Sequence, residues 1–116
     1  MTERELQEAV RQLAALYGWR YFHVFNSRRS PAGFPDCVLV KPPRLVIAEL
    51  KSDDGRVTPA QKVWLEDLRR SSCEVYVWKP ADLQDIARIL SPASEVGRDS
   101  KTPSGGRAPA SVWVDG

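Results

Sequence analysis

The sequence predicts an α/β fold in which helices pack on a mixed β-sheet, in the order α-β-β-β-α-β-α. Three observations carry this prediction: segments whose apolar residues recur at helical spacing, short runs rich in β-branched and aromatic residues, and turn-forming residues that separate the two. In the second half of the chain, a strand, a helix and another strand follow one another, which is the order of a right-handed parallel crossover. The earlier strands should pair antiparallel, so the sheet is mixed.

The chain should begin with an amphipathic helix over residues 3–17, because its apolar residues form one stripe. Thr2 is placed to cap the helix, Glu5 stands at the capping-box position, and Gly18 follows the last turn. Residues 19–25 are rich in aromatic and β-branched side chains and indicate the first strand.

A hairpin should follow, with strands at residues 36–40 and 44–51. A second helix starts at Pro59, since proline is favoured at the first helical position. We expect a fourth strand at residues 74–78 and a short terminal helix at residues 80–90.

Composition is that of one globular domain: 116 residues, 42% hydrophobic and 28% charged, with a net charge of +2. Any nucleic-acid contact must therefore come from a local basic patch. No apolar run approaches the ~20 residues of a membrane span, and the charged N-terminus shows no signal peptide, so we expect a cytoplasmic protein without membrane contact. Residues 1–90 should form the domain, and residues 91–116, rich in Ser, Pro and Gly, a flexible tail.

Cysteine and histidine are too few for several kinds of chemistry. A structural zinc site needs four ligands, whereas Cys37, Cys73 and His23 are three widely spaced residues. Nothing in their spacing supports a Cys–His nucleophile, and His23 is expected to be structural. We expect reduced thiols and no organic cofactor.

The hairpin brings two carboxylates together. If residues 41–44, which contain Pro42-Pro43, form the connection, Asp36 lies directly opposite Glu49. Such side chains have Cβ atoms about 4.5–5.5 Å apart, and like charges placed there repel. A bound cation would compensate the repulsion, and Lys51, on the same face as Glu49, is another candidate.

A third carboxylate can come from the first helix. Glu3 continues the apolar stripe toward the sheet, whereas Glu5 lies off it, so Glu3 is preferred over Glu5 as a ligand of a metal or its water. Glu3 could instead be a first-turn acid favoured by the helix dipole.

Two further features flank this cluster. Gln61 fits a capping box with Thr58, but its amide could instead point into the cleft beside Lys51, and the sequence leaves both open. Arg28 and Arg29, in the loop before Asp36, are candidate phosphate contacts or simply solvated loop residues.

The chain resembles the VRR-NUC family of the PD-(D/E)xK nuclease superfamily over about residues 2–90. The resemblance is carried by four segments and by the loop Asn26-Ser27-Arg28-Arg29. The segments are Gly33-x-Pro35-Asp36, Glu49-x-Lys51, Thr58-Pro59-x-Gln61 and Glu3-x-x-Leu6-Gln7. It implies a restriction-endonuclease-like fold and a metal-dependent phosphodiesterase acting on DNA. Small family members look like dimeric, phage-type enzymes that cut branched DNA such as four-way junctions, and larger relatives carry the module in repair nucleases.

The resemblance also implies roles for individual residues. Asp36, Glu49, the Leu50 carbonyl and Glu3 offer hard oxygen ligands for Mg²⁺, for which Mn²⁺ can substitute. Lys51 would orient the attacking water or stabilise charge on the phosphate, with Gln61 beside it. DNA contacts fall to Arg28, Arg29 and Gly33.

Two other functions remain open. A non-catalytic DNA-binding module on the same fold would bind without metal and cut nothing, although the intact Asp36, Glu49 and Lys51 set argues against it. A restriction-type endonuclease is the second alternative. We see no added recognition domain in so short a chain, which favours recognition of DNA structure over DNA sequence.

Overall fold

The computed structural model describes residues 1–25 and 30–92. Arg28 and Arg29 lie outside the described residues, as does nearly all of the predicted tail. The division into a domain at 1–90 and a tail at 91–116 therefore stays a prediction. Within the described ranges, no helix is long and apolar enough to cross a membrane.

The predicted order of helices and strands is confirmed. Along the chain the elements are α1 (Glu3–Leu16), β1 (Arg20–His23), β2 (Cys37–Lys41), β3 (Arg44–Leu50), α2 (Pro59–Arg69), β4 (Glu74–Trp78), the 3₁₀ turn η1 (Pro80–Asp82) and α3 (Leu83–Leu90). The strands lie in the order β1-β2-β3-β4, antiparallel except for the parallel pair β3–β4. The crossover through α2 is thus the parallel unit that the sequence predicts.

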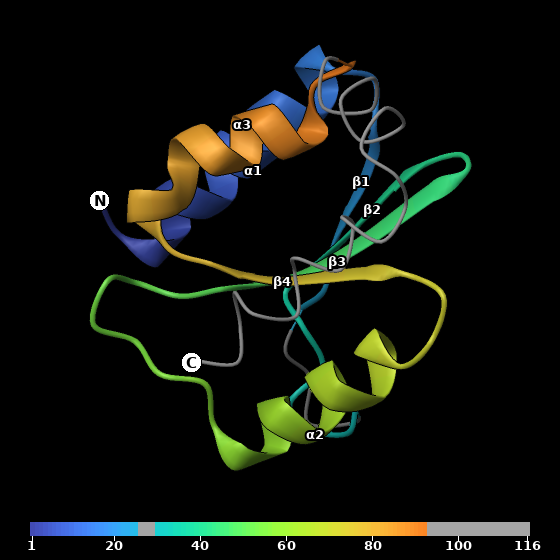
Figure 1. The fold of residues 1–116 in the computed structure, drawn as a ribbon. Coiled ribbons are helices and arrows are strands. Elements are labelled where there is room, and N and C mark those ends of the chain that lie inside the picture. The colour runs from blue at the N-terminus through green and yellow to red at the C-terminus, as the bar shows by residue number, and fades with distance from the viewer. Residues whose placement is uncertain (26–29, 93–116) are drawn as a thin grey trace.

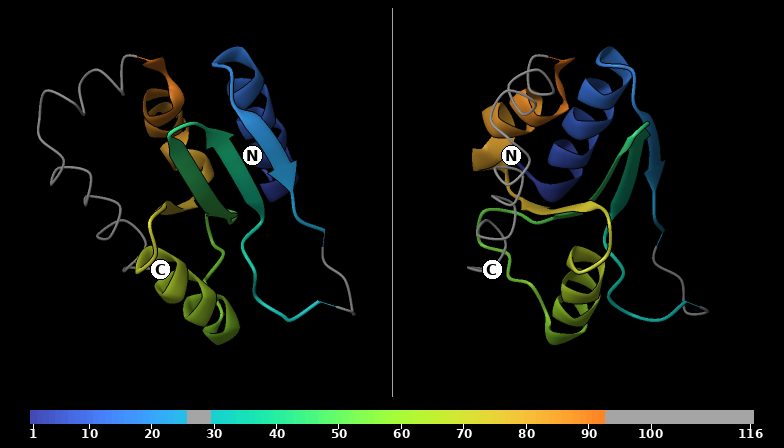
Figure 2. Two further views of the ribbon diagram at one scale, coloured as in Figure 1. Left: turned by 90° about the vertical axis from the view of Figure 1, so that its right-hand side faces the viewer. Right: turned by 45° about the vertical axis from the view of Figure 1, so that its right-hand side comes forward.

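Helices cover both faces of the sheet (Figure 1). α1 and α3 lie side by side on one face, and the turned views show α2 alone on the other (Figure 2). The larger core lies between the sheet and the α1–α3 pair. It includes Leu6, Val10, Leu39, Val46, Trp78 and Ile86. A smaller core beneath α2 is built on Leu65, Val75 and Val77.

The hairpin pairs in the predicted register. Lys41 lies opposite Arg44, and Cys37 lies opposite Ala48. One further step along both strands leads to Asp36 and Glu49, but Asp36 precedes the first residue of β2. The carboxylate of Asp36 is therefore carried on the last residue of the incoming loop.

Element ends differ from the predictions by a few residues. β1 is shorter than 19–25, partly because the Trp19 N–H donates to the Ala14 carbonyl and so completes the end of α1. The terminal helix starts with η1, in which the Asp82 carboxylate accepts a hydrogen bond from the Lys79 amide.

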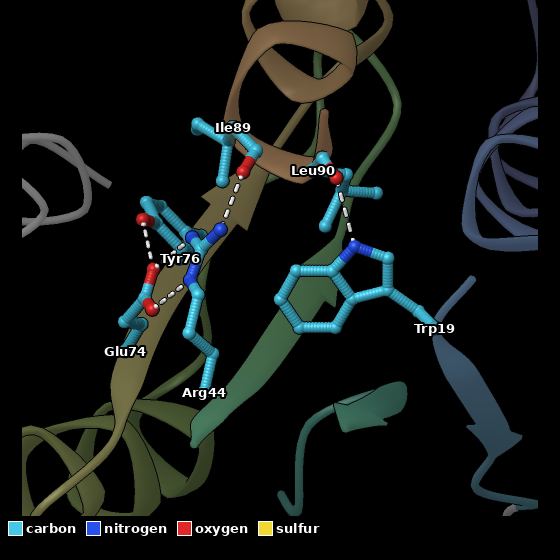
Figure 3. A network of polar contacts seen from close by, with 6 residues as sticks. All are labelled: Trp19, Arg44, Glu74, Tyr76, Ile89 and Leu90. Atoms are coloured by element: carbon cyan, nitrogen blue, oxygen red, sulfur yellow. Dashed lines mark hydrogen bonds and ion pairs between the residues drawn. The ribbon is translucent and has the colours of Figure 1, made fainter. Parts of the chain in front are cut away.

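A polar network holds α3 against the hairpin end of the sheet (Figure 3). Arg44 donates two hydrogen bonds of 2.8 Å to Glu74 and one of 3.0 Å to the Ile89 carbonyl. The Trp19 indole donates to the Leu90 carbonyl at 2.8 Å. Two carbonyls from the last turn of α3 are thus satisfied by side chains from β3 and from the residue before β1.

Candidate active site

A buried glutamate lies where β3 approaches its end. Glu49 is 2% exposed and belongs to a strand whose other interior residues are apolar. Its Oε2 accepts a hydrogen bond of 2.8 Å from Gln61 Nε2 and lies 3.4 Å from Lys51 Nζ. Among the described residues its Oε1, although buried, has no hydrogen-bond partner. A buried carboxylate oxygen without a partner is costly, and that cost calls for a compensating group.

Asp36 is held at both its backbone and its side chain. Its carbonyl accepts from the Val24 amide at 2.7 Å, just beyond β1. Its carboxylate Oδ2 accepts from the Leu50 amide at 2.7 Å. Asp36 is therefore fixed between two strands, at the end of β3 that carries Glu49.

Lys51 enters the cluster as the chain leaves the sheet. Its amide donates to the Trp78 carbonyl at 2.9 Å, which extends the β3–β4 pairing by one bond. Its side chain is 14% exposed, and its ammonium group approaches the Glu49 oxygen that also binds Gln61. Positive charge is thus placed beside Glu49 Oε2, the oxygen that also has a hydrogen-bond partner.

Gln61 combines the two arrangements that the sequence left open, the capping box and an amide group that points into the site beside Lys51. Its Oε1 accepts from the Thr58 amide at 2.9 Å, and Thr58 Oγ1 accepts from the Gln61 amide, which completes the capping box of α2. Its Nε2 meanwhile donates to Glu49. The first turn of α2 is therefore tied directly to the buried carboxylate.

The two N-terminal glutamates are separated as the helical stripe suggests. Glu5 closes the capping box of α1 by accepting from the Thr2 amide at 2.8 Å. Glu3 is near the cluster: burial raises its pKa, Asp36 raises it further, and Lys51 lowers it. The structure thus brings Glu3, and not Glu5, within electrostatic reach of Asp36 and Lys51.

Electrostatics around Glu49 disfavour its ionised form. Burial is the largest cause of the raised pKa of Glu49, and the negative charges of Asp36 and, more weakly, Glu3 raise it further. Lys51 opposes them through its charge and its contact, yet together these effects raise the pKa of Glu49 to about 8. A cation at this position would favour the charged form and satisfy the unpartnered oxygen.

The carboxylates of this cluster fit a hard divalent ion, but protein side chains alone would not complete its coordination. Asp36 and Glu49 supply carboxylate oxygens of the type that such ions prefer. In the part of the chain that the structure describes, no three His, Cys, Asp or Glu side chains converge closely enough to hold an ion as they stand. Mg²⁺ usually keeps several waters and takes one or two carboxylates, so two carboxylates suit it.

Gly33 packs against α2. Its φ is 98°, and a Cβ built on it would lie 2.6 Å from the Ala60 carbonyl oxygen. Next to it, the Phe34 ring meets the Trp64 ring edge-on at 5.0 Å. These contacts dock the loop that leads into Asp36 onto the helix that carries Gln61. The DNA contact expected of Gly33 stays a prediction, as do those of Arg28 and Arg29.

Some contacts of the site escaped the sequence analysis. The Leu50 amide, which binds Asp36, belongs to a residue that was considered only for its carbonyl. The Val24 amide could have been found by extending the β1–β2 register one step past His23 and Cys37. Backbone donors carry no residue-type signature, so only strand register predicts them.

Comparisons with known proteins place the chain among proteins of known family and fold. A family model described as the VRR-NUC domain matches residues 2–82. A solved VRR_NUC domain is 18% identical, with a TM-score of 0.62, over 78% of this chain and 96% of that one. The Holliday junction resolvase Hjc of Archaeoglobus fulgidus is 23% identical, with a TM-score of 0.47, over 67% of this chain and 65% of that one. No curated protein matches. The match of the family model over most of the chain shows that this protein belongs to the VRR-NUC family of nucleases.

Proposed function

We propose that the protein is a metal-dependent endonuclease that hydrolyses phosphodiester bonds in DNA and prefers branched DNA. The observation that carries the proposal is the buried Glu49 Oε1, which has no partner within the described residues and belongs to a carboxylate next to Asp36. In a nuclease family, two neighbouring carboxylates with one buried oxygen left unpartnered are best explained as half of a cation site.

Each residue of the cluster has a role in this proposal. Asp36 and Glu49, with the Leu50 carbonyl, hold the ion, and Glu3 reaches it directly or through water. Mg²⁺, or Mn²⁺ in its place, would there polarise the phosphate and lower the pKa of a water molecule. Lys51 places its ammonium group beside the reacting phosphate, where it orients the water or stabilises the developing negative charge. Gln61 positions Glu49.

Partners of the site follow from the same proposal. Arg28, Arg29 and Gly33 contact the DNA backbone on the loop that leads into Asp36. Two copies related by a two-fold axis would present two such sites, an arrangement suited to symmetric cuts across a junction. Light scattering on the purified protein, alone and with a four-way junction, tests the dimer.

The central experiment compares DNA substrates and metals. Labelled four-way junction, flap, single-stranded and linear duplex DNA are incubated with the protein in Mg²⁺, Mn²⁺ or EDTA. We expect cleavage only with metal, and fastest on branched DNA. Binding in EDTA without cleavage of any substrate under any condition would favour the non-catalytic DNA-binding module.

Matched variants then assign the site. Asp36→Asn, Glu49→Gln and Lys51→Met should each lower the cleavage rate at least 100-fold with the fold retained by circular dichroism. Asp53→Asn removes an exposed carboxylate two residues beyond Lys51 and should leave the rate unchanged. A folded Asp36→Asn protein that cleaves at the wild-type rate would contradict the assignment of Asp36 to the active site.

A further inference from the structure

The loop after β3 folds back onto Lys51. The Gly55 amide donates to the Ser52 carbonyl at 2.9 Å, which closes a turn directly after the lysine. A Cβ built on Gly55 would lie 3.2 Å from Lys51 Cβ and 3.3 Å from Lys51 Cδ. Carbon atoms in good contact are about 3.5–4.0 Å apart, so no side chain fits at Gly55 unless Lys51 or the turn moves.

Limited space, and not backbone conformation, is what opposes a side chain at Gly55. Gly18 and Gly33 have positive φ angles, whereas Gly55 does not, so its backbone is open to other residues. The third atom close to the built Cβ is the Ser52 amide nitrogen, at 3.3 Å. Two of the three neighbours, Lys51 Cβ and the Ser52 nitrogen, are fixed by the backbone and cannot yield by side-chain rotation alone.

Lys51 is thus fixed at its backbone and at its ammonium end, and its stem passes close to Gly55. Its amide is bonded to the Trp78 carbonyl, its stem lies against Gly55, and its ammonium group is 3.4 Å from Glu49 Oε2. A lysine stem has four rotatable bonds and is ordinarily mobile, so its position must be imposed by such contacts.

We propose that Gly55 is a positioning residue for Lys51: the bare backbone at Gly55 sets where the stem lies and so where the ammonium group stands relative to Glu49 and the reacting phosphate. This inference rests on the proposed function for its effect on the rate, but the contact itself does not. A methyl group at Gly55 requires Lys51 or the turn to give by a few tenths of an ångström, and misplacement on the order of 1 Å can cost about 100-fold in rate.

The test uses Gly55→Ala in the full chain. In metal-free protein, we expect the ¹³Cε resonance of Lys51, assigned with Lys51→Arg, to shift relative to the wild type. On branched DNA with Mg²⁺, we expect kcat to fall roughly 10-fold or more with KM within twofold, because the variant changes the group that acts on the reacting phosphate and not the surface that binds DNA. Asp54→Ala, in the same turn and exposed, is the control and should change neither measurement.

The outcomes separate this proposal from the proposed function. An unchanged Lys51 resonance in Gly55→Ala overturns the positioning role, whether or not the protein cleaves DNA. A wild-type kcat in Gly55→Ala overturns it as well. If wild-type protein cleaves no DNA but the resonance shifts, the proposed function fails and the contact stands. If Gly55→Ala does not fold, Lys51→Gly and Lys51→Gly/Gly55→Ala are compared. The contact is supported when both fold, and it is overturned when Lys51→Gly folds and the double variant does not.

Discussion

The side chain of Gln61 joins the cap of α2 to the buried carboxylate of Glu49. Its Oε1 accepts from the Thr58 amide at 2.9 Å, and its Nε2 donates to Glu49 Oε2 at 2.8 Å. Because only the carbonyl oxygen can accept from the Thr58 amide, the cap fixes the orientation of the amide group and directs its NH₂ at Glu49. Helix α2 thereby determines that Oε2 is occupied and that Oε1 is the oxygen left for a ligand.

Removal of Gln61 should affect both stability and cleavage. Gln61→Ala takes away one acceptor of the cap and one of the two partners of Glu49 Oε2, so we expect a loss of about 1–3 kcal/mol in the free energy of unfolding and slower cleavage. Thr58→Ala removes the other half of the capping box but keeps the bond to Glu49. It should cost about 1 kcal/mol and leave the cleavage rate unchanged. Urea denaturation and single-turnover cleavage measure both, and a Gln61→Ala protein with wild-type cleavage contradicts the bridging role.

Stability of the metal-free protein should fall as the pH rises from about 5 to 8. Burial and the Asp36 charge raise the pKa of Glu49 to about 8 in the folded state, against an ordinary value of 4.5. Between these values the folded state binds more protons than the unfolded state, so the free energy of unfolding decreases with increasing pH. The stabilisation is complete below about pH 4.5 and is lost as the pH approaches 8.

Glu49→Gln isolates that effect, because glutamine does not titrate. In thermal unfolding in EDTA, the Tm should decrease less between pH 5 and pH 8 in the variant than in the wild type. Mg²⁺ should raise the Tm of the wild type most at pH 8. If the Tm changes equally with pH in the two proteins, Glu49 is already ionised at pH 5, which contradicts the raised pKa inferred from its surroundings.

The sequence was sufficient for those parts of the site that depend on local periodicity. The position of the hairpin connection sets the pairing register, and the structure has that register from Lys41 opposite Arg44 to Cys37 opposite Ala48. The helical stripe likewise separates Glu3 from Glu5, because i and i+3 positions share a face of α1 and the capping box uses Glu5.

Contacts that depend on how elements dock could not be predicted in this way. Gln61 was placed between two alternatives because its reach to Glu49 depends on the position of α2 over the sheet, which no spacing in the sequence encodes. The close approach of Gly33 to Ala60 is of the same kind. Glycine in a loop admits many explanations, and only the packed structure tells a tight contact from a turn.

Gly33→Ala should disturb α2 and not merely strain one residue. Both Gly33 and Gly18 have positive φ angles, 98° and 83°, so alanine at either position costs backbone strain of roughly 1–2 kcal/mol. At Gly18 nothing lies within 4 Å of the built Cβ, whereas at Gly33 the Ala60 carbonyl oxygen lies at 2.6 Å. We therefore expect Gly33→Ala to lose more stability than Gly18→Ala.

Cleavage distinguishes the two glycine variants further. Displacement of Ala60 moves the turn that holds Gln61, so Gly33→Ala should also slow cleavage under conditions in which both proteins are folded. Gly18→Ala should cleave at the wild-type rate. Indistinguishable losses of stability and activity in the two variants would show that Gly33 contributes only its backbone conformation.

Arg44 should stabilise the fold without affecting the site. It lies at the opposite end of β3 from Glu49, about 17 Å away at the usual rise of an antiparallel strand. Its guanidinium group binds Glu74 through two hydrogen bonds and the Ile89 carbonyl through a third, and it stacks 4.9 Å from the centre of the Trp19 ring (Figure 3). Arg44→Met leaves the half-buried Glu74 without this partner, and we expect a loss of about 2–4 kcal/mol in the free energy of unfolding.

Tyr76→Phe provides the matched control for Arg44. It removes only the hydroxyl that donates to Glu74 at 2.8 Å and should cost about 1 kcal/mol. Both variants should cleave DNA at the wild-type rate at a temperature at which they are folded, because neither residue contacts Asp36, Glu49 or Lys51 in the hydrogen bonds and ion pairs described above. A rate that falls in Arg44→Met while the protein stays folded would mean that the docking of α3 is transmitted along β3 to the buried carboxylate.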